Sequence, residues 1–178
     1  MPEFGVKILP RSTTWVSRID SYFLNNSAEI MDKDYQQTQS LVAIQNGSLF
    51  GVGPGKSTQR SILPYSESDF IFAIILEEYG FFGGTIALLL YLILFFRAIK
   101  ISFKTDSIFG GLIVVGLMFS LVFQALINML VSVEIIPVTG QTLPLISMGG
   151  TSLVFTFISL GIILSVSRNS LNGVYEKV

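Results

Sequence analysis

Residues 70–96 read FIFAIILEEYGFFGGTIALLLYLILFF, and this stretch decides the fold. Only two of its side chains, those of Glu77 and Glu78, carry a formal charge. A helix needs roughly 20 apolar residues to cross a hydrocarbon core of about 30 Å, and this stretch is long enough. It therefore predicts a transmembrane helix.

Two further apolar runs, Ile108–Val133 and Leu143–Val166, have the same character. The chain is 51% hydrophobic and only 13% charged, whereas soluble domains carry about a quarter charged residues. Its mean hydropathy is +0.66. These features predict an all-α integral membrane protein, in which residues 69–178 form a polytopic bundle with three transmembrane helices. The polar region 1–68, with six of the eleven Lys and Arg residues, is predicted to be a large extracytoplasmic loop.

The composition excludes several kinds of chemistry. The chain contains no cysteine and no histidine, which excludes disulfides, thiol nucleophiles, Cys/His zinc sites and histidine bases within it. A net charge of -1 gives no basic surface for nucleic acid. Acid–base or metal chemistry must therefore use carboxylates.

The cations predict the orientation of the helices. Residues 97–107 carry three cations, two more follow the third apolar run, and residues 134–142 carry none. By the positive-inside rule, residues 97–107 and the C-terminus are cytoplasmic, whereas residues 1–68 and 134–142 are extracytoplasmic. The first residues contain no apolar signal segment, so we expect earlier spans in the intact protein, with a translocated amino-terminal tail as the alternative.

Polar side chains interrupt the first two apolar runs. Glu77 and Glu78 either face a bundle interior or cavity or, if the helix begins near Tyr79, lie at the membrane interface. Gln124 and Asn128 are four residues apart and share one helix face. We interpret this pair as hydrogen-bonding groups that join neighbouring helices.

The third apolar run begins with residues that interrupt a regular helix. Pro144, Gly149 and Gly150 lie within its first turns. Glycines permit close helix packing, but a broken helix at membrane depth also lines cavities, where its freed backbone groups can be satisfied. Both interpretations stay open at this point.

Asp69 directly precedes the first apolar run. There it can cap the helix by accepting hydrogen bonds from its first N–H groups, which would keep the carboxyl ionised. A carboxylate at the membrane surface can equally accept a proton from a hydroxyl of a lipid-linked substrate. The two roles are compatible.

The stretch GVGPGKSTQR at 51–60 contains the Gly-Lys-Ser of a nucleotide-binding loop. Phe50 stands where that motif needs its first glycine, Pro54 removes a backbone N–H, and no apolar helix follows. ATP binding is therefore disfavoured. The loop is either a site for another anion or a solvated turn.

Five blocks in order resemble the SEDS family of FtsW, RodA and SpoVE: YQQTQSLVAI at 35–44, GSLFGVGPGKSTQR at 47–60, SDFIFAIILEEYG at 68–80, FQALIN at 123–128 and PVTGQTLPLISMGGTS at 137–152. The resemblance implies a multi-pass protein of the bacterial inner membrane that polymerises lipid II into peptidoglycan glycan strands. The second block is more similar to the cell-division branch, FtsW. The chain would be the carboxy-terminal part of such a protein, surrounded by membrane lipids and partnered by a class B penicillin-binding protein transpeptidase.

The resemblance also implies site residues. Asp69 corresponds to the proposed catalytic residue of the family and would act as general base. Pyrophosphate chemistry often uses a divalent cation, so Asp69 and substrate oxygens would be able to hold Mg²⁺ or Mn²⁺. The substrate-binding candidates are Lys56, Ser57, Gln59 and Arg60 in the loop, and Gln39, Glu78, Ser147, Gly149 and Gly150 elsewhere in the matching blocks.

Two other functions fit the same sequence pattern. A transporter of lipid-linked precursors would also combine broken helices with buried carboxylates, and Glu77 and Glu78 would then matter more than Asp69. A non-catalytic divisome scaffold would recruit the transpeptidase through helix faces and would tolerate loss of the Asp69 carboxylate.

Overall fold

The computed structural model describes residues 31–63, 67–105 and 107–175, and all regular secondary structure in these ranges is helical. Three helices are long and apolar enough to cross a membrane. The predicted all-helical membrane fold is therefore confirmed; residues 1–30 of the predicted loop region lie outside the described residues. The helices are α2 (Met31–Gly47), α3 (Gln59–Ile62), α4 (Ile71–Lys104), α5 (Ile108–Ser132) and α6 (Gly150–Tyr175).

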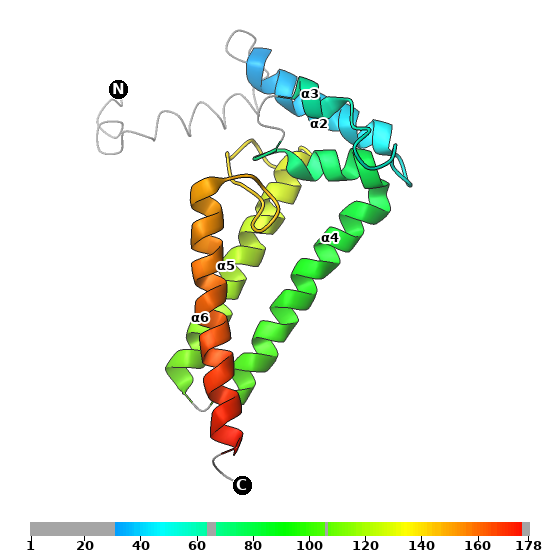
Figure 1. The fold of residues 1–178 in the computed structure, drawn as a ribbon. Coiled ribbons are helices and arrows are strands. Elements are labelled where there is room, and N and C mark those ends of the chain that lie inside the picture. The colour runs from blue at the N-terminus through cyan, green and yellow to red at the C-terminus, as the bar shows by residue number, and fades with distance from the viewer. Residues whose placement is uncertain (1–30, 64–66, 106, 176–178) are drawn as a thin grey trace, which may run out of the picture.

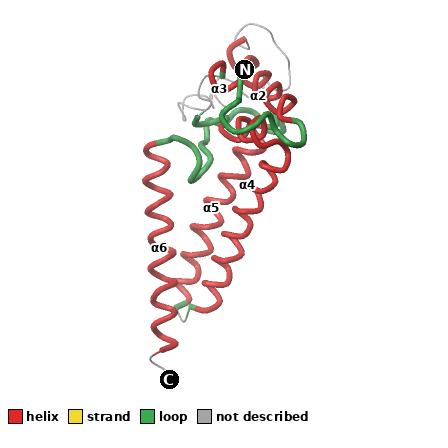
Figure 2. The backbone as a smooth tube through the Cα atoms, turned by 45° about the vertical axis from the view of Figure 1, so that its right-hand side comes forward, coloured by secondary structure: helices red, strands yellow, loops and turns green. Residues whose placement is uncertain are grey.

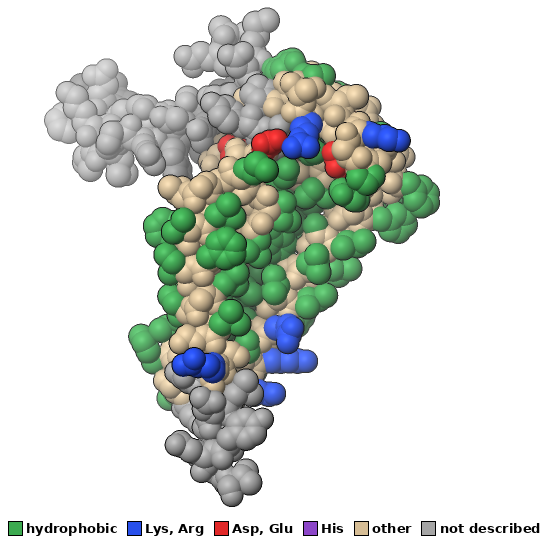
Figure 3. All heavy atoms as spheres, viewed as in Figure 1, with side chains coloured by type: hydrophobic (Ala, Val, Ile, Leu, Met, Phe, Trp, Pro, Cys, Tyr) green, Lys and Arg blue, Asp and Glu red, His purple; other side chains and the backbone are tan. Residues whose placement is uncertain are grey.

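The three long helices run side by side, and α5 packs against both α4 and α6 (Figures 1 and 2). At one end, α2 and α3 lie across the beginning of α4, near the loop between α5 and α6. The opposite end holds the connection from α4 to α5 and the C-terminus. On the face seen in Figure 3, Lys and Arg side chains gather towards the two ends, and hydrophobic side chains cover the length between them.

The core between α4 and α5 follows from helical periodicity. Val114, Met118, Val122 and Ala125 are buried along one face of α5, as spacings of three and four residues require. They pack in one cluster with residues of α4 that include Ala87. The outer faces of the long helices instead expose large apolar side chains, which suits lipid as the surrounding solvent.

Gly80 breaks α4 into two helical pieces. Its φ of 69° and ψ of -169° are non-helical and are essentially restricted to glycine. The break frees backbone groups, and the loop between α2 and α3 satisfies them: the carbonyls of residues 77 and 78 accept from Val52 N (2.9 Å) and Gly53 N (3.0 Å), and Phe81 N donates to Ser48 O (3.1 Å). The single helix expected over 70–96 is therefore a short helix followed by a longer one.

Both glutamates of the first apolar run precede this break. Glu77 and Glu78 therefore belong to the short piece, which lies across the end of the bundle in Figure 1. This agrees with the alternative in which the long apolar helix begins near Tyr79. The same helix continues to Lys104, beyond the expected end at Phe96.

The third apolar run becomes helical only at Gly150, not at Leu143 as expected. Leu145 has a positive φ of 69°, which a right-handed helix does not allow. The Ser147 hydroxyl accepts a hydrogen bond from Leu143 N (2.7 Å), and the Tyr91 hydroxyl of α4 donates to Pro144 O. These contacts hold residues 143–149 as a folded turn; α6 then extends to Tyr175, past the expected end at Val166.

The Gly80 break gives a direct test of this packing. A Cβ added at Gly80 would lie 2.4 Å from Leu49 O, in addition to the positive φ. We expect Gly80→Ala in the full-length protein to lower the free energy of unfolding by about 2 kcal/mol, measured as a lower unfolding midpoint in detergent.

Gly161→Ala on α6 is the matched control, because a Cβ there meets nothing within 4 Å. It should leave the midpoint unchanged or raise it slightly, since alanine favours a helix over glycine. Equal midpoints for the two variants would contradict the close approach at Gly80.

Candidate functional site

The segment before α4 is held by hydrogen bonds to three successive main-chain carbonyls, those of residues 67–69. Met148 N donates to the first (2.9 Å), Ser147 Oγ donates to the second, and Asn128 Nδ2 donates to the third (2.8 Å). The donors come from α5 and from the turn before α6. The main chain at Asp69 is thereby fixed to elements far away in the sequence.

Asn128 is the centre of this arrangement. Its side chain is 1% exposed, and Nδ2 also donates to Gln141 O (2.6 Å). One turn earlier, Gln124 Nε2 donates to Thr142 O (3.0 Å). The pair expected to join two helices therefore binds main-chain carbonyls next to α4 and in the loop between α5 and α6.

The Asp69 side chain is partly exposed, and Oδ1 accepts from Ser68 Oγ (3.0 Å). The N-cap of α4 is Phe70, and no side-chain hydrogen bond caps the helix. The interpretation of Asp69 as a helix cap is therefore wrong. Its other oxygen faces the loop between α5 and α6, since a Cβ built on Gly140 would lie 3.9 Å from Oδ2.

The anion held by the glycine-rich loop is the chain's own Glu77. Its carboxylate is 1% exposed and accepts from Ser57 Oγ, Thr58 Oγ1 (3.0 Å), Thr58 N (3.3 Å) and Gln59 N (3.3 Å). A buried carboxylate is costly unless donors surround it. Ser57 and Gln59, two of the substrate-binding candidates, direct these donors at Glu77, whereas Lys56 is exposed to solvent.

Arg60 links this loop to the segment that carries Asp69. Its guanidinium is 2.9 Å from Glu67 Oε1, and this carboxylate raises the pKa of Arg60 above its ordinary value. The two side chains line a pocket of about 150 Å³ together with Glu78 and isoleucines of α4. The Arg60 guanidinium is therefore held by Glu67, which lies two residues before Asp69 in the sequence.

The predicted site residues fall into two neighbourhoods. Ser147 and Gly149 accompany Asp69 around the turn before α6, whereas Glu78 belongs with the loop residues. Gln39 is half-buried on α2, and Gly150 is exposed at the first residue of α6. Within the described residues, no group of three or more acidic side chains comes together to hold a metal ion. The expectation that Asp69 and substrate oxygens hold a cation stays a prediction.

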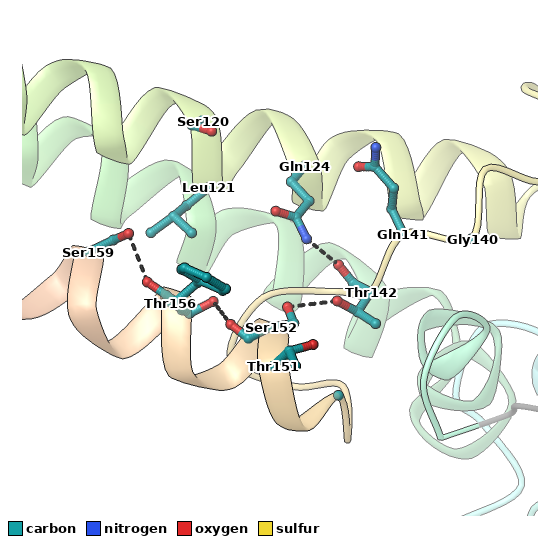
Figure 4. A pocket seen from close by; sticks show the side chains of 12 residues that line it. Ser120, Leu121, Gln124, Gly140, Gln141, Thr142, Thr151, Ser152, Thr156 and Ser159 are labelled. Carbon is teal, nitrogen blue, oxygen red and sulfur yellow. Dashed lines mark hydrogen bonds between the residues drawn. The ribbon is translucent and has the colours of Figure 1, made fainter. Parts of the chain in front are cut away.

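A groove of about 490 Å³ lies between α5, α6 and the loop that joins them (Figure 4). Its lining includes Gly140 and Gly149, so the cavity interpretation of the broken third run is supported for Gly149. Most of the other lining residues are polar but uncharged, and the sequence analysis named only Gln124 among them, as a group that joins helices. A pattern of hydroxyl residues at helical spacing on α6 is the signal that could have found them: Ser152, Thr156 and Ser159.

Comparisons with known proteins cover most of the chain. A family model described as cell cycle protein, FTSW_RODA_SPOVE, matches residues 8–172. The chain is 43% identical over 156 residues to stage V sporulation protein E of Bacillus subtilis, covering 87% of this chain and 42% of that protein. It is 40% identical over 158 residues to the probable peptidoglycan glycosyltransferase FtsW of Hydrogenovibrio crunogenus, covering 86% and 41%. The chain spans about two fifths of the length of these relatives.

A solved structure is also similar. A chain of a peptidoglycan synthase complex matches with a TM-score of 0.66 and 27% identity, over 94% of this chain and 47% of that chain. The identities to the sporulation protein and to FtsW are close to each other. The cell-division branch therefore stays a prediction.

Asn128→Asp tests the link between α5 and the Asp69 segment. The variant keeps the shape of the side chain but replaces the amide donor by a carboxylate. The carbonyls of Asp69 and Gln141 therefore lose their hydrogen-bond donor. We expect the free energy of unfolding to fall by about 1–3 kcal/mol, measured in detergent on the full-length protein. The same exchange at exposed Asn46 on α2 is the control and should change stability little; equal effects would exclude a special role for Asn128.

Glu77→Gln tests the anion-binding loop. An amide NH₂ would face two of the donors that now bind a carboxylate oxygen, so we expect the loop to open more often. Trypsin should then cut faster after Lys56 or Arg60. The neighbouring Glu78→Gln should leave the cleavage rate at its wild-type value, and the idea fails if the two variants are cut alike.

Proposed function

Because this chain belongs to the FtsW, RodA and SpoVE family of cell cycle proteins, we propose that the intact protein is a peptidoglycan glycosyltransferase that polymerises lipid II, with Asp69 as its general base. Relatives named as peptidoglycan glycosyltransferases support the reaction type. The observation that carries the proposal is the fixed carboxylate beside a polar groove. Asp69 is partly exposed, does not cap its helix, and has one oxygen directed towards Gly140 of the groove.

The proposed reaction transfers a glycan chain between lipid-linked sugars. The Asp69 carboxylate accepts the proton of an acceptor hydroxyl, whose oxygen attacks the anomeric carbon of the donor. The bond from that carbon to the polyprenyl pyrophosphate breaks, and the pyrophosphate leaves with the electron pair. Precise placement of the base supplies part of the rate, and the hydrogen bonds to residues 67–69 provide that placement.

Two cations of the glycine-rich loop suit the leaving group. Lys56 is exposed in this loop, and Arg60 is bound to Glu67 in the segment that carries Asp69. We assign stabilisation of the pyrophosphate to these two side chains, because charge-assisted hydrogen bonds are the strong ones for phosphate oxygens. Ser57 and Gln59 act indirectly, because their hydrogen bonds to Glu77 hold the loop in place. If Mg²⁺ or Mn²⁺ is bound, it would neutralise pyrophosphate charge, and Asp69 is the chain's candidate ligand for it.

We infer that the reaction takes place on the extracytoplasmic side. The basic residues of 97–107 lie at the end of the bundle opposite to Asp69 and the α5–α6 loop, and this distribution favours a cytoplasmic position for them. A class B penicillin-binding protein transpeptidase is the proposed partner. The similarity to a chain of a peptidoglycan synthase complex supports such an assembly.

The contacts of Glu77 weigh against the transporter hypothesis. Transport through this region would use the buried carboxylates, but that of Glu77 is surrounded by donors from residues 57–59. The scaffold hypothesis gives no reason for the Asp69 carboxylate to lie beside a groove without capping its helix. Both hypotheses predict that the protein forms no glycan.

Asp69→Asn provides the decisive variant. The amide keeps the size of the side chain but cannot accept the proton, so we expect the rate of lipid II polymerisation to fall by about a hundredfold or more. The measurement uses full-length protein with its transpeptidase partner in detergent, at matched expression and unfolding midpoint.

Glu134→Gln is the control, since it neutralises a carboxylate in the loop between α5 and α6 that takes no part in the proposed reaction. It should change the rate by no more than a few-fold. Normal polymerisation by Asp69→Asn would refute the assignment of the base.

A further inference from the structure

We propose that the groove between α5 and α6 binds the saccharide part of the substrate: an uncharged, N-acetylated sugar chain, bound without its pyrophosphate. The inference rests on the proposed function and adds to it the place where the glycan lies. Three observations carry it: the polar lining of the groove, the absence of charged side chains from that lining, and the proximity of Asp69 to Gly140.

The two helices turn polar faces towards each other. On α6, residues 151, 152, 156 and 159 line the groove, and on α5 residues 120 and 124 do so. The spacing of residues 152, 156 and 159 places them on one face of α6, and Figure 4 shows these three side chains and that of Gln124 in the space between the helices. Helices of this length in lipid rarely carry so many hydroxyl and amide groups on one side unless that side faces protein or a water-filled cavity.

The chemistry of the lining fits sugar hydroxyls. None of the lining residues carries a charge, so the groove offers no counterion for a phosphate. Serine and threonine hydroxyls both donate and accept hydrogen bonds, as sugar hydroxyls do. The Thr156 hydroxyl donates to Ser152 O (2.8 Å) and that of Ser159 donates to Phe155 O (2.9 Å), which leaves their oxygens able to accept from a ligand.

Phe155 adds an apolar surface to the same groove. Its ring is 70% exposed although it lines the cavity. Binding pockets commonly combine aromatic surface with a few placed polar groups, and the C–H face of a sugar ring packs on such a surface. The mixed lining therefore matches a pyranose better than it matches an ion.

The position of the groove connects it to the reaction. Gly140 lines the groove and is also the residue towards which Asp69 Oδ2 is directed. The adjacent Gln141 lines the groove and is tied through Asn128 to the main chain of Asp69. A sugar in the groove would thus place its end next to the proposed base, while Lys56 and Arg60 lie outside the lining.

The test uses a lipid-free tetrasaccharide of N-acetylglucosamine as the probe, because it is N-acetylated and carries no charge. Its Kd is measured on the full-length protein with its partner in detergent. Thr151→Val and Ser159→Ala in the groove should each weaken binding about three- to tenfold, the loss of one hydrogen bond. Thr85→Val on α4 and Ser165→Ala on α6 are matched controls outside the lining and should change Kd less than twofold.

Wild-type affinity in both groove variants would overturn the inference, even if the protein polymerises lipid II normally. The proposed function fails separately, if wild-type protein forms no glycan from lipid II. A tetrasaccharide that does not bind wild-type protein also overturns the inference.

A second measurement separates a sugar site from a helix-packing face. The chain has no cysteine, so Ser120→Cys and Ser159→Cys introduce thiols on the two walls. With native cysteines elsewhere in the full-length protein removed, a water-soluble maleimide should label both, and the tetrasaccharide should slow the labelling at least threefold. Leu164→Cys on an exposed apolar part of α6 is the control and should stay unlabelled in lipid. Unlabelled groove thiols would mean that another helix fills the space and would contradict the inference.

Discussion

The structure depends on hydrogen bonds that satisfy main-chain groups where apolar helices stop. Residues 67–69 form a turn just before α4, and their carbonyls accept hydrogen bonds from Met148, Ser147 and Asn128. A main-chain carbonyl that loses its partner on burial costs free energy comparable to a lost hydrogen bond. The contacts that remove this cost are the same contacts that fix Asp69 in space. Stability and the proposed catalysis are thus coupled at one segment.

The same constraint explains two other non-helical segments, the break at Gly80 and the turn before α6. At the Gly80 break, the loop between α2 and α3 supplies N–H and carbonyl partners to the interrupted helix. The turn before α6 is closed by its own Ser147 and by Tyr91 of α4. Each break in an apolar run is therefore filled by a polar contact from a distant part of the chain. The irregular segments gather at one end of the bundle, and the candidate site is built from them.

The sequence predicted the regular parts because their causes are local. Apolar runs indicated three long helices, and the motif blocks indicated the family. The loop at 51–60 showed why a motif alone is insufficient: its donors bind an anion, but the anion is Glu77, twenty residues after Ser57. The break at Gly80 was missed because its cause is the close approach of Leu49 O, a contact that no local pattern encodes. The groove was missed because its hydroxyl residues on α6 form a site only together with α5, which lies opposite them.

The central claim is that the turn before α6 holds the Asp69 segment through the main chain. The Met148 side chain is 68% exposed, yet its N–H donates to Glu67 O (2.9 Å) in a non-helical turn. Residue-resolved hydrogen exchange of the full-length protein in detergent measures this bond directly. We expect the Met148 amide to exchange as slowly as amides within α6, because its exchange requires the Asp69 segment to detach. Exchange at the rate of a solvent-exposed turn would contradict the account.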